Sequence, residues 1–373
     1  MIFCKICNNK KKLTNTRTVI KSNLPVFNHI SFNKISNSCT YTQCNYCQII
    51  SVQQNKEIKK NIKYFTSKIY SNSKQTSQKK NINKKKKYLY RSQHQANYIS
   101  KNIKKNEVNI LDIGCFDGKL LGYLSLICKK SFFYGHDINL FLKKSFPNKK
   151  NFFFIKEIND IKCKFDCIIF SHSIMYIKNL AQTLLTCKKL LKRDGKIFIQ
   201  IPNIKKNIFY CLMGDQYYNF TESSLINICK LFGFKVKKID KKHFPREIVL
   251  VLKKNININN KNKKLIKKDS IFQKNLISLN KLKHKLEKKF NKNQYLVLGT
   301  TVNAAFVDEI ISKNINHFVD ENLTLDKNYF REKKIYHPRK IYNYQNVILP
   351  FINTGNTILS RFKKMYKGNY IKI

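Results

Sequence analysis

Two aspartates and two glycines between residues 108 and 120 are the part of the sequence best suited to chemistry. Asp112 ends an apolar run, Asp117 follows Gly114 in the same short turn, and Gly118 closes it. Glycines let backbone N–H groups approach a ligand where a side chain would block them. Two carboxylates would repel a pyrophosphate, so this turn favours a cationic or neutral ligand.

A further acid, Asp137, stands at the end of the next apolar run. In nucleoside-binding α/β folds, an acid about 20 residues beyond the glycine turn accepts hydrogen bonds from the ribose hydroxyls. The spacing therefore predicts that Asp137 binds a ribose.

To act together, Asp112 and Asp137 must lie at the ends of neighbouring strands. Apolar runs predict strands at residues 108–112, 132–137, 152–155, 165–170, 195–201, 233–239 and 246–252, the fifth stopped by Pro202. Helical periodicity separates several of them, as at residues 120–127 and 180–191. This alternation predicts a doubly wound α/β sheet that binds ligands at the carboxyl ends of its strands.

The turn and its neighbours resemble the first motif of class I S-adenosylmethionine (SAM) methyltransferases, a family with a Rossmann-like fold. In that family the turn holds the methionine end of SAM, the acid after the second strand binds the ribose, and the segment after the third strand contacts the adenine. The resemblance implies SAM as cofactor, bound here by Asp112, Gly114, Cys115, Asp117, Gly118, Asp137, Ile138, Glu157, Ile158 and Ser171.

Two Cys-x-x-Cys pairs, Cys4 with Cys7 and Cys44 with Cys47, precede this domain. Each pair presents two thiolates to one metal, and four thiolates complete the tetrahedral sphere of structural Zn²⁺. About 60 residues of mostly polar chain need such a metal to fold. We expect a structural zinc ion in a ribbon-like module, with Cys39 as a spare or substitute ligand. Dithiol redox chemistry is disfavoured, because neither pair lies at a strand-to-helix junction.

The C-terminal third predicts an amphipathic helix and a second α/β unit. Ser270 is the expected N-cap of a helix whose apolar residues recur at steps of three and four, namely Phe272, Leu276, Leu279, Leu282, Leu286 and Phe290. A strand, a turn at Gly299, a helix and a strand ending in Asp320 then repeat a Rossmann-like order. This unit either binds the nucleotide part of an acceptor, through residues 299–301 and Asp320, or only shapes the cleft.

The order of parts resembles one group of SAM methyltransferases, including sugar C-methyltransferases, with an N-terminal zinc module and a C-terminal α/β domain. Its marks are both cysteine pairs and the segments 200–203, 215–221, 318–322 and 336–338. The expected parts are a zinc-binding module (1–60), a basic helical linker or lid (61–105), a SAM-dependent methyltransferase domain (106–254), a linker with the amphipathic helix (255–292) and a C-terminal Rossmann-like α/β domain (293–373). The lid alternative would place the aromatic residues of that segment over the site, namely Tyr64, Phe65, Tyr70 and Tyr88.

The residue that removes the acceptor's proton is left open by the sequence. In the sugar C-methyltransferases a Glu-His pair serves deprotonation, whereas this chain has Asp215 and Gln216, and Gln216 cannot act as a base. Either the acceptor is an O- or N-nucleophile with other needs, or the base comes from elsewhere, with His172, Tyr176, Asp215 and Tyr217 as the catalytic candidates.

Composition narrows the remaining function classes. The formal net charge of +53 suggests nucleic acid, yet 67 of the 74 basic residues are Lys and 7 are Arg, whereas phosphate and base recognition favours the guanidinium group. We interpret the charge as compositional drift, with a real polyanion-binding surface as the alternative. No apolar run approaches the ~18 residues of a membrane span. Several of the twelve cysteines fall in expected core positions, which favours a reducing compartment and a cytoplasmic location.

The leading hypothesis is a cytoplasmic SAM-dependent methyltransferase acting on a small carbohydrate-like acceptor, such as a nucleotide-linked sugar in surface-glycan assembly. The sugar rests on the resemblance alone. An RNA methyltransferase using the basic surface and a non-catalytic SAM-binding scaffold are the alternatives.

Overall fold

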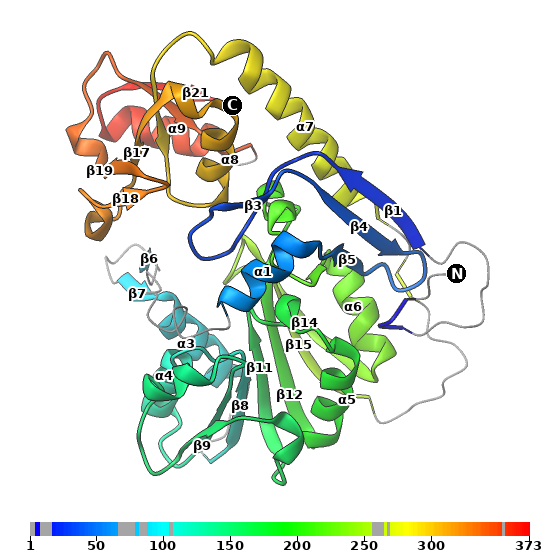
Figure 1. Cartoon of the computed structure of the whole chain (residues 1–373). Helices are drawn as coiled ribbons and strands as arrows, with labels where there is room; N and C mark the ends of the chain where they lie inside the picture. Colours follow the sequence, from blue (N-terminus) through cyan, green and yellow to red (C-terminus); the bar gives the residue numbers. More distant parts are fainter. Residues whose placement is uncertain are drawn as a thin grey trace.

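The structure, a computed structural model of the chain, describes residues 4–7, 17–65, 79–81, 88–103, 107–255, 265–266, 269–352 and 355–373. Figure 1 shows a large central sheet in green, a blue N-terminal sheet beside it, and a C-terminal α/β unit in orange and red above it. Tyr70 lies outside the described residues, as do the side chains of Phe65 and Tyr88, so the tyrosine lid stays a prediction.

A seven-stranded sheet forms the centre of the molecule. In sheet order its strands are β10 (Phe152–Ile155), β9 (Phe132–His136), β8 (Asn109–Ile113), β11 (Phe165–Ser171), β12 (Leu191–Pro202), β15 (Glu247–Lys254) and β14 (Phe234–Asp240). The first five are parallel, whereas β15 is antiparallel to both of its neighbours. Because the strand order reverses between β8 and β11, a crevice forms at their carboxyl ends. The predicted Rossmann-like fold class is confirmed.

Helices cover both faces of this sheet because its strands are apolar on both sides. Ile168 packs in a cluster with α5 (Leu180–Leu190) and α6 (Glu222–Leu231), while Ile169, the next residue of β11, packs with α3 (Arg91–Ile103) and α4 (Lys119–Ile127). Consecutive strand residues point to opposite faces, so the two helix pairs cover opposite sides.

The segment before the sheet differs from the sequence-based expectation. Residues 56–100 are rich in Lys, Asn and Ser, and this composition by itself favours a solvated helix or loop in which a few aromatic residues are the apolar anchors. Instead, α3 buries six of its residues, namely His94, Gln95, Ala96, Tyr98, Ile99 and Ile103. Apolar residues in this helix are few, but they recur on one face, so packing outweighs the mean polarity. A short hairpin, β6 (Lys79–Asn81) with β7 (Tyr88–Tyr90), precedes it.

The N-terminal sheet includes one strand, β13, that comes from the central part of the chain. Its order is β1 (Arg17–Ser22), β4 (Cys39–Cys44), β5 (Ile50–Gln53) and β13 (Tyr218–Asn219), with β2 (Val26–Phe27) and β3 (Lys34–Ser36) as a separate pair and α1 (Lys56–Phe65) following β5. β13 pairs antiparallel with β5, so main-chain hydrogen bonds join the N-terminal module to the segment that follows Asp215.

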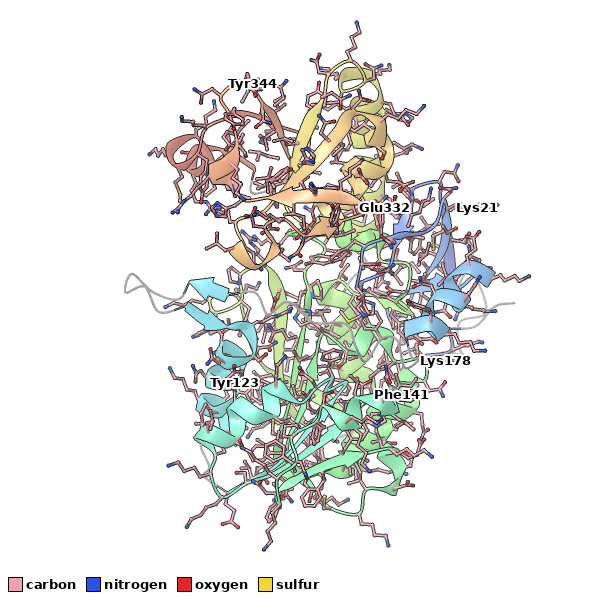
Figure 2. All side chains as sticks on the ribbon, turned by 60° about the vertical axis from the view of Figure 1, so that its left-hand side comes forward. Lys21, Tyr123, Phe141, Lys178, Glu332 and Tyr344 are labelled. Carbon is pink, nitrogen blue, oxygen red and sulfur yellow. The ribbon has the colours of Figure 1, made fainter. Side chains whose placement is uncertain are left out.

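The C-terminal unit is a second, mostly parallel α/β sheet. Its strand order is β18 (Tyr329–Phe330), β19 (Lys333–Tyr336), β17 (Ile315–Val319), β16 (Tyr295–Leu298), β20 (Asn346–Leu349) and β21 (Asn369–Lys372), with α8 (Val302–Ile311) and α9 (Gly355–Met365). Only the pairing of β18 with β19 is antiparallel among its described strands. Figure 2 shows this unit, with Glu332 and Tyr344, above the central sheet, with Phe141 and Lys178.

The amphipathic helix α7 (Ile271–Lys289) connects the two α/β units. All six apolar residues expected on its buried face are buried. Ser270 holds the N-cap position but its side chain makes no capping hydrogen bond, and Asp269 Oδ1 accepts the N–H of Ile271 at 3.3 Å instead. Ser270 is thus the N-cap residue, as predicted, although its side chain does not cap the helix. Among the described helices, none is both long and apolar enough to cross a membrane.

Short 3₁₀ helices complete the described elements. They are η1 (Leu140–Lys144), η2 (Ile158–Asp160), η3 (Ile174–Tyr176), η4 (Ile208–Leu212), η6 (Ser312–Asn314), η7 (Leu323–Leu325) and η8 (Pro338–Lys340). Five of them, η1, η2, η3, η4 and η7, contribute residues to the cavity described below.

Candidate active site between the two α/β units

A cavity of about 1390 Å³ lies at the carboxyl ends of β8, β9 and β11 and reaches the C-terminal unit. All the predicted cofactor-binding residues line it except Gly118, and so do the four catalytic candidates His172, Tyr176, Asp215 and Tyr217. The structure therefore gathers into one cavity residues that the sequence placed on separate segments.

Gly114 begins the turn after β8 and has a positive φ of 79°. Its N–H donates to the carbonyl of His136 at 2.7 Å, which joins the turn to the end of β9. A Cβ at this position would lie 2.3 Å from Cβ of Ser173, whose hydroxyl donates to the carbonyl of Ile113. Both the backbone conformation and the neighbouring side chain therefore require glycine.

Gly118, at the other end of the turn, has a packing role. It has a φ of 72°, and a Cβ there would lie 2.7 Å from the ring of Phe146. Gly118 was predicted to contact the cofactor, but it does not line the cavity, because Phe146 and Pro147 pack against it.

Asp112 is a buried carboxyl group with only 2% of its surface exposed. Its Oδ1 atom has no hydrogen-bond partner among the described residues. Burial, and secondly the nearby charge of Asp137, raise the pKa of Asp112 to about 8. An unsatisfied buried acceptor at a cavity wall is suited to a ligand that brings a donor or a positive charge.

Asp137 follows β9 and is held by backbone donors. Its Oδ2 accepts the N–H of Phe116 at 3.1 Å and its Oδ1 accepts the N–H of Asn139 at 2.9 Å. Burial raises the pKa of Asp137, and these backbone donors oppose that rise. The carboxylate is thereby oriented at the cavity wall, as a group that binds a vicinal diol must be.

Two residues of the cavity wall that lie next to the predicted cofactor site have a strained backbone. Phe116 in the glycine turn and His172 after β11 both have positive φ, 51° and 57°. Bulky residues avoid this region of φ, and such strain clusters at functional sites.

The remaining predicted cofactor residues lie along the same wall. Ile138, exposed over 75% of its surface, and Ile158 of η2 provide apolar surface there, and Glu157 precedes η2. The hydroxyl of Ser171 accepts a hydrogen bond from Nε2 of Gln95 at 2.8 Å. Asp117 forms a local ion pair with Lys119 at 2.6 Å, and the thiol of Cys115 is buried against the turn.

An orphaned acceptor, a glycine cradle and an oriented acid together fit a cofactor with a cationic end and a ribose. Asp112 and Gly114 would hold the amino-acid end of SAM, and Asp137 would hold the ribose hydroxyls. When bound, the cofactor supplies an electrophilic methyl group. The chain's own contribution is to position both reactants and to accept a proton.

His172 lies within a polar network at the edge of the cavity. Its backbone N–H donates to the carbonyl of Gln200 at 2.8 Å, and its Nε2 lies 3.6 Å from Oε2 of Glu247. Arg91 donates to Oε1 of the same carboxylate at 3.1 Å. These contacts hold the imidazole against the wall on which β11 and β12 end.

Tyr176 and Tyr217 face the cavity from two adjoining segments. Nε2 of Gln216 donates to the hydroxyl of Tyr176 at 3.2 Å. Tyr217 is fixed through its backbone, which donates to the carbonyl of Met175 at 2.9 Å and accepts from the N–H of Val52 at 3.0 Å. Burial raises the pKa of the Tyr217 hydroxyl above its ordinary value.

His29 is the main site residue that sequence reasoning missed. Its Nδ1 lies 2.5 Å from Oδ2 of Asp215, and its side chain lines the cavity from the N-terminal module. A single histidine in a loop of that module gives no sequence signal of this kind, because its partner lies far along the chain. Asp215, a catalytic candidate from the sequence, also lines the cavity, and its role stays a prediction.

The C-terminal unit repeats the geometry of the glycine turn. Gly299 has a φ of 94° and donates its N–H to the carbonyl of Val319 at 2.7 Å, as Gly114 does to His136. Asp320 follows β17 and accepts a hydrogen bond from the hydroxyl of Thr300 at 2.9 Å. Burial raises the pKa of Asp320. Gly299, Thr300 and Asp320 line the far side of the same cavity.

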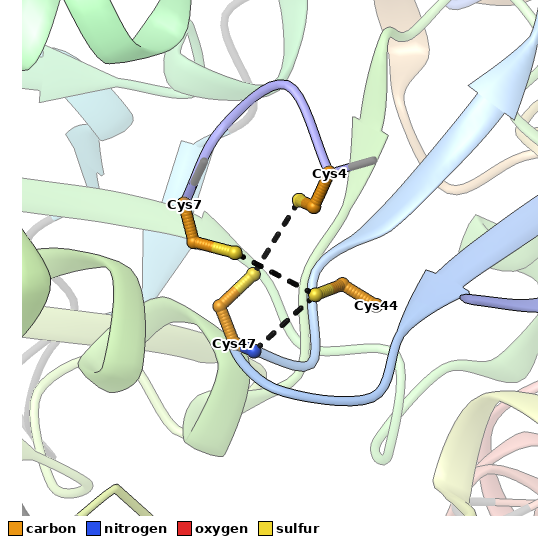
Figure 3. Close-up of side chains that lie close together, drawn as sticks. All are labelled: Cys4, Cys7, Cys44 and Cys47. Atoms are coloured by element: carbon orange, nitrogen blue, oxygen red, sulfur yellow. Dashed lines mark hydrogen bonds between the residues drawn. The ribbon is translucent and has the colours of Figure 1, made fainter. Parts of the chain in front are cut away.

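Four cysteines form a separate cluster away from the cavity (Figure 3). The sulfur atoms of Cys4 and Cys47 are 3.8 Å apart, those of Cys7 and Cys44 are 3.7 Å apart, and all four lie within 4.8 Å of one another. Zinc–sulfur bonds of about 2.3 Å give a tetrahedron with edges of about 3.8 Å, so the four side chains fit one zinc ion. Hydrogen bonds from Cys44 and the other thiols lower the pKa of Cys4, which favours a thiolate there.

Cys39 takes no part in this cluster, so the expectation of a substitute ligand is wrong. Its thiol instead donates to the carbonyl of Thr40 at 3.7 Å. It lies on β4 five residues before Cys44, where an extended strand carries it away from the metal site.

Comparisons with known proteins agree with this architecture. Residues 79–239 match the sequence model of a family described as a methyltransferase domain. No curated protein matches the sequence.

Several solved structures are distantly similar to part of this chain. A SAM-dependent methyltransferase from Clostridium acetobutylicum has 14% identity, a TM-score of 0.37, and covers 53% of this chain and 98% of its own. The plantazolicin methyltransferase BpumL in complex with SAH has 18% identity, a TM-score of 0.37, and covers 44% and 82%. A SAM-dependent methyltransferase from Aquifex aeolicus has 16% identity, a TM-score of 0.36, and covers 43% and 90%. These likenesses are too distant to indicate an acceptor.

The family match includes β8, β9 and the turn that carry Asp112, Gly114 and Asp137. The central part of this chain is therefore a methyltransferase domain, and the protein is a methyltransferase enzyme.

Proposed function

We propose that this protein transfers the methyl group of SAM to a small carbohydrate-like acceptor carried on a nucleotide. The observation that supports this most is the single cavity shared by two Rossmann-like edges, one with Asp112 and Asp137 and the other with Gly299 and Asp320. Pockets for one drug-sized ligand measure about 300–1,000 Å³. A cavity of about 1390 Å³ therefore has room for the cofactor and for a second ligand of similar size.

The donor occupies the edge of the central sheet. The positively charged methionine end of SAM would lie against Asp112, whose Oδ1 it would satisfy, and its adenine would lie against the apolar surface of Ile138 and Ile158. Asp137 would accept hydrogen bonds from the ribose. The cationic donor would also favour the ionised form of Asp112, which burial alone disfavours.

The acceptor's nucleotide occupies the opposite edge. Asp320 is placed as Asp137 is, at the end of the second strand of a Rossmann-like unit, and would bind a ribose in the same manner. Arg246 and Lys206 line the space between the two edges and carry the positive charge that a diphosphate requires. Arg246 is one of only 7 arginines in the chain, and the guanidinium group suits bidentate binding of phosphate.

The zinc module contributes a wall of the cavity. A zinc ion on Cys4, Cys7, Cys44 and Cys47 would fix the sheet of β1, β4 and β5, which is joined by β13 to the segment after Asp215. A closed four-sulfur site leaves no position for substrate, so the metal's role is structural.

Calorimetry and an assay with labelled methyl groups test this function. The protein should bind SAH with a stoichiometry of one, and it should methylate one or more members of a panel of uridine and thymidine diphosphate sugars. The Asp112→Asn variant should bind SAH at least about tenfold more weakly, whereas Asp194→Asn, at an exposed position on β12, should bind like the wild type. Absence of SAH binding would refute the donor, and transfer to RNA but to no nucleotide sugar would refute the acceptor class.

A further inference from the structure

His29 and Asp215 form a dyad across two parts of the chain. Besides the 2.5 Å contact of the His29 ring with Oδ2 of Asp215, the backbone N–H of His29 donates to the same oxygen at 2.9 Å. Asp215 is 3% exposed, and within the described part of the chain its Oδ1 has no hydrogen-bond partner. A buried carboxylate that accepts from Nδ1–H leaves Nε2 as the basic nitrogen of the imidazole.

Main-chain contacts hold the two residues together. The N–H of Gly214 donates to the carbonyl of Phe27 at 2.9 Å, and Phe27 forms a β-bridge with Met213. The side-chain oxygen of Asn28 accepts the N–H of Ile30 at 3.0 Å, which fixes the turn that carries His29. Backbone pairing between the segment before His29 and the segment before Asp215 therefore sets the distance between these two residues.

The C-terminal unit clamps the same loop. Nη1 of Arg331 donates to the carbonyl of Phe32 at 3.0 Å, while its other nitrogens contact Asp308 at 2.7 Å and Glu309 at 2.5 Å. The loop of His29 is thus fixed by β2 from one side and by the second α/β unit from the other. Such support from neighbouring residues is what a catalytic group requires to keep its orientation.

His29 lines the same cavity as the cofactor turn. Its ring lies 4.6 Å from the ring of Tyr176, centroid to centroid. Tyr176 is the last residue of η3, and Ser173 is the N-cap of the same short helix. Ser173 packs on Gly114 in the cofactor turn. His29 and the glycine turn therefore adjoin the same short stretch of chain.

We propose that His29 is the catalytic base and that Asp215 is the residue that positions it; this rests on the proposed function. As the acceptor atom forms its bond to the methyl carbon, the carbon–sulfur bond breaks, its electron pair stays on sulfur, and SAH leaves. The acceptor's proton passes to Nε2 of His29, while Asp215 holds Nδ1–H and stabilises the imidazolium that results. His29 supplies the proton acceptor that Gln216 cannot be.

His172 is the competing base, and its contacts favour another role. Its imidazole lies beside Glu247, which is shared with Arg91 and Gln200, so this histidine belongs to a network between strands and α3. His29 has instead a dedicated carboxylate that contacts both its ring and its backbone.

The first test needs no acceptor. Nitrogen-15 NMR of the imidazoles in the SAH-bound protein should show His29 as the Nδ1–H tautomer, and Asp215→Asn should shift its tautomer ratio towards Nε2–H. If neutral His29 of the wild type carries its proton on Nε2, the proposal that His29 is the base is wrong. A tautomer ratio that is unchanged in Asp215→Asn would also contradict it.

The second test uses the nucleotide-sugar panel. With a sugar that the wild type methylates, His29→Gln should lower kcat by about 100-fold or more, because a general base contributes about 10²–10⁴. KM and SAH affinity should change less than about threefold. His284→Gln on the exposed face of α7 is the matched control, and His172→Gln should lower kcat far less than His29→Gln. A kcat of His29→Gln within a few-fold of the wild type overturns the proposal. If the wild type methylates nothing in the panel, the proposed function fails, and the tautomer measurement still decides the dyad.

Discussion

Asp112 and Asp137 stand at the carboxyl ends of neighbouring parallel strands, and the charge of Asp137 adds to burial in raising the pKa of Asp112 to about 8. Two acids so close together are unfavourable in the absence of a ligand, because each disfavours ionisation of the other. A positive charge between or beside the two carboxylates would lower the free energy of their ionised forms. We therefore infer that this pair of acids binds a cationic ligand.

The stability of the protein should therefore depend on pH through Asp112. Its folded pKa lies above its unfolded value near 4, so its contribution to stability is complete below about pH 4 and is lost as the pH rises through about 8. Asp112→Asn removes this loss. In urea titrations between pH 5.5 and 9, the variant should exceed the wild type by a free energy of unfolding that grows with pH to a few kcal/mol. A difference that does not vary with pH would contradict the assignment.

Gly114→Ala should abolish cofactor binding. The new Cβ would approach Ser173 to 2.3 Å and would force a side chain onto a φ of 79°, so the turn must move. Gly122→Ala is the control, because a Cβ there meets no described atom within 4 Å and lies inside α4, where alanine favours the helix by about 1 kcal/mol. In thermal unfolding, Gly114→Ala should melt below the wild type and Gly122→Ala above it. SAH calorimetry should show a loss of binding in Gly114→Ala alone, and equal SAH affinities of the two variants would argue against the turn as a cofactor site.

Cys47→Ser should remove the metal and loosen the N-terminal module. Four thiolates at tetrahedral spacing predict one zinc ion per chain, and three leave the sphere open. Metal analysis after dialysis should find about one zinc in the wild type and in Cys39→Ser, and much less in Cys47→Ser. Loss of zinc should also weaken methyl transfer, since the module carries His29. A full zinc complement in Cys47→Ser would exclude this ligand set.

Arg331→Met should destabilise the contact between the C-terminal unit and the loop of His29. Arg331 is largely buried and contacts Asp308, Glu309 and the carbonyl of Phe32. Its removal leaves each carboxylate with one lysine as partner and takes a donor from the carbonyl. We expect a loss of about 2 kcal/mol in the free energy of unfolding, measured in urea. Arg361→Met breaks an exposed pair with Glu321 and should cost less than about 1 kcal/mol. Similar losses in both variants would show that the clamp is not special.

The basic composition should have little effect on small-molecule turnover. If the net charge of +53 reflects drift, binding to a generic RNA should be weak, with a shallow log–log dependence on salt between 50 and 200 mM. Fluorescence anisotropy with a labelled RNA measures this slope. A slope of several units together with methylation of RNA would favour the nucleic-acid alternative.

Local sequence was sufficient for the parts of the fold that depend on neighbouring residues. The strand, glycine turn and helix around Asp112 could be predicted because periodicity and turn chemistry act over a few residues. The four-cysteine cluster followed from the fixed reach of two Cys-x-x-Cys turns. By contrast, β18 (Tyr329–Phe330), α9 (Gly355–Met365) and β21 (Asn369–Lys372) were missed in a segment rich in Lys and Asn. Their few apolar residues become buried only against strands already in place.

The sequence by itself thus determined where a nucleoside-binding turn begins, which acid follows it and which thiols can share a metal. Only the tertiary structure decided that Gly118 packs against Phe146, that β13 joins the N-terminal sheet, and that His29 meets Asp215. The last pair is separated by 186 residues. A contact over that distance has no period and no spacing to reveal it, because it is set by the packing of three units that fold around one cavity.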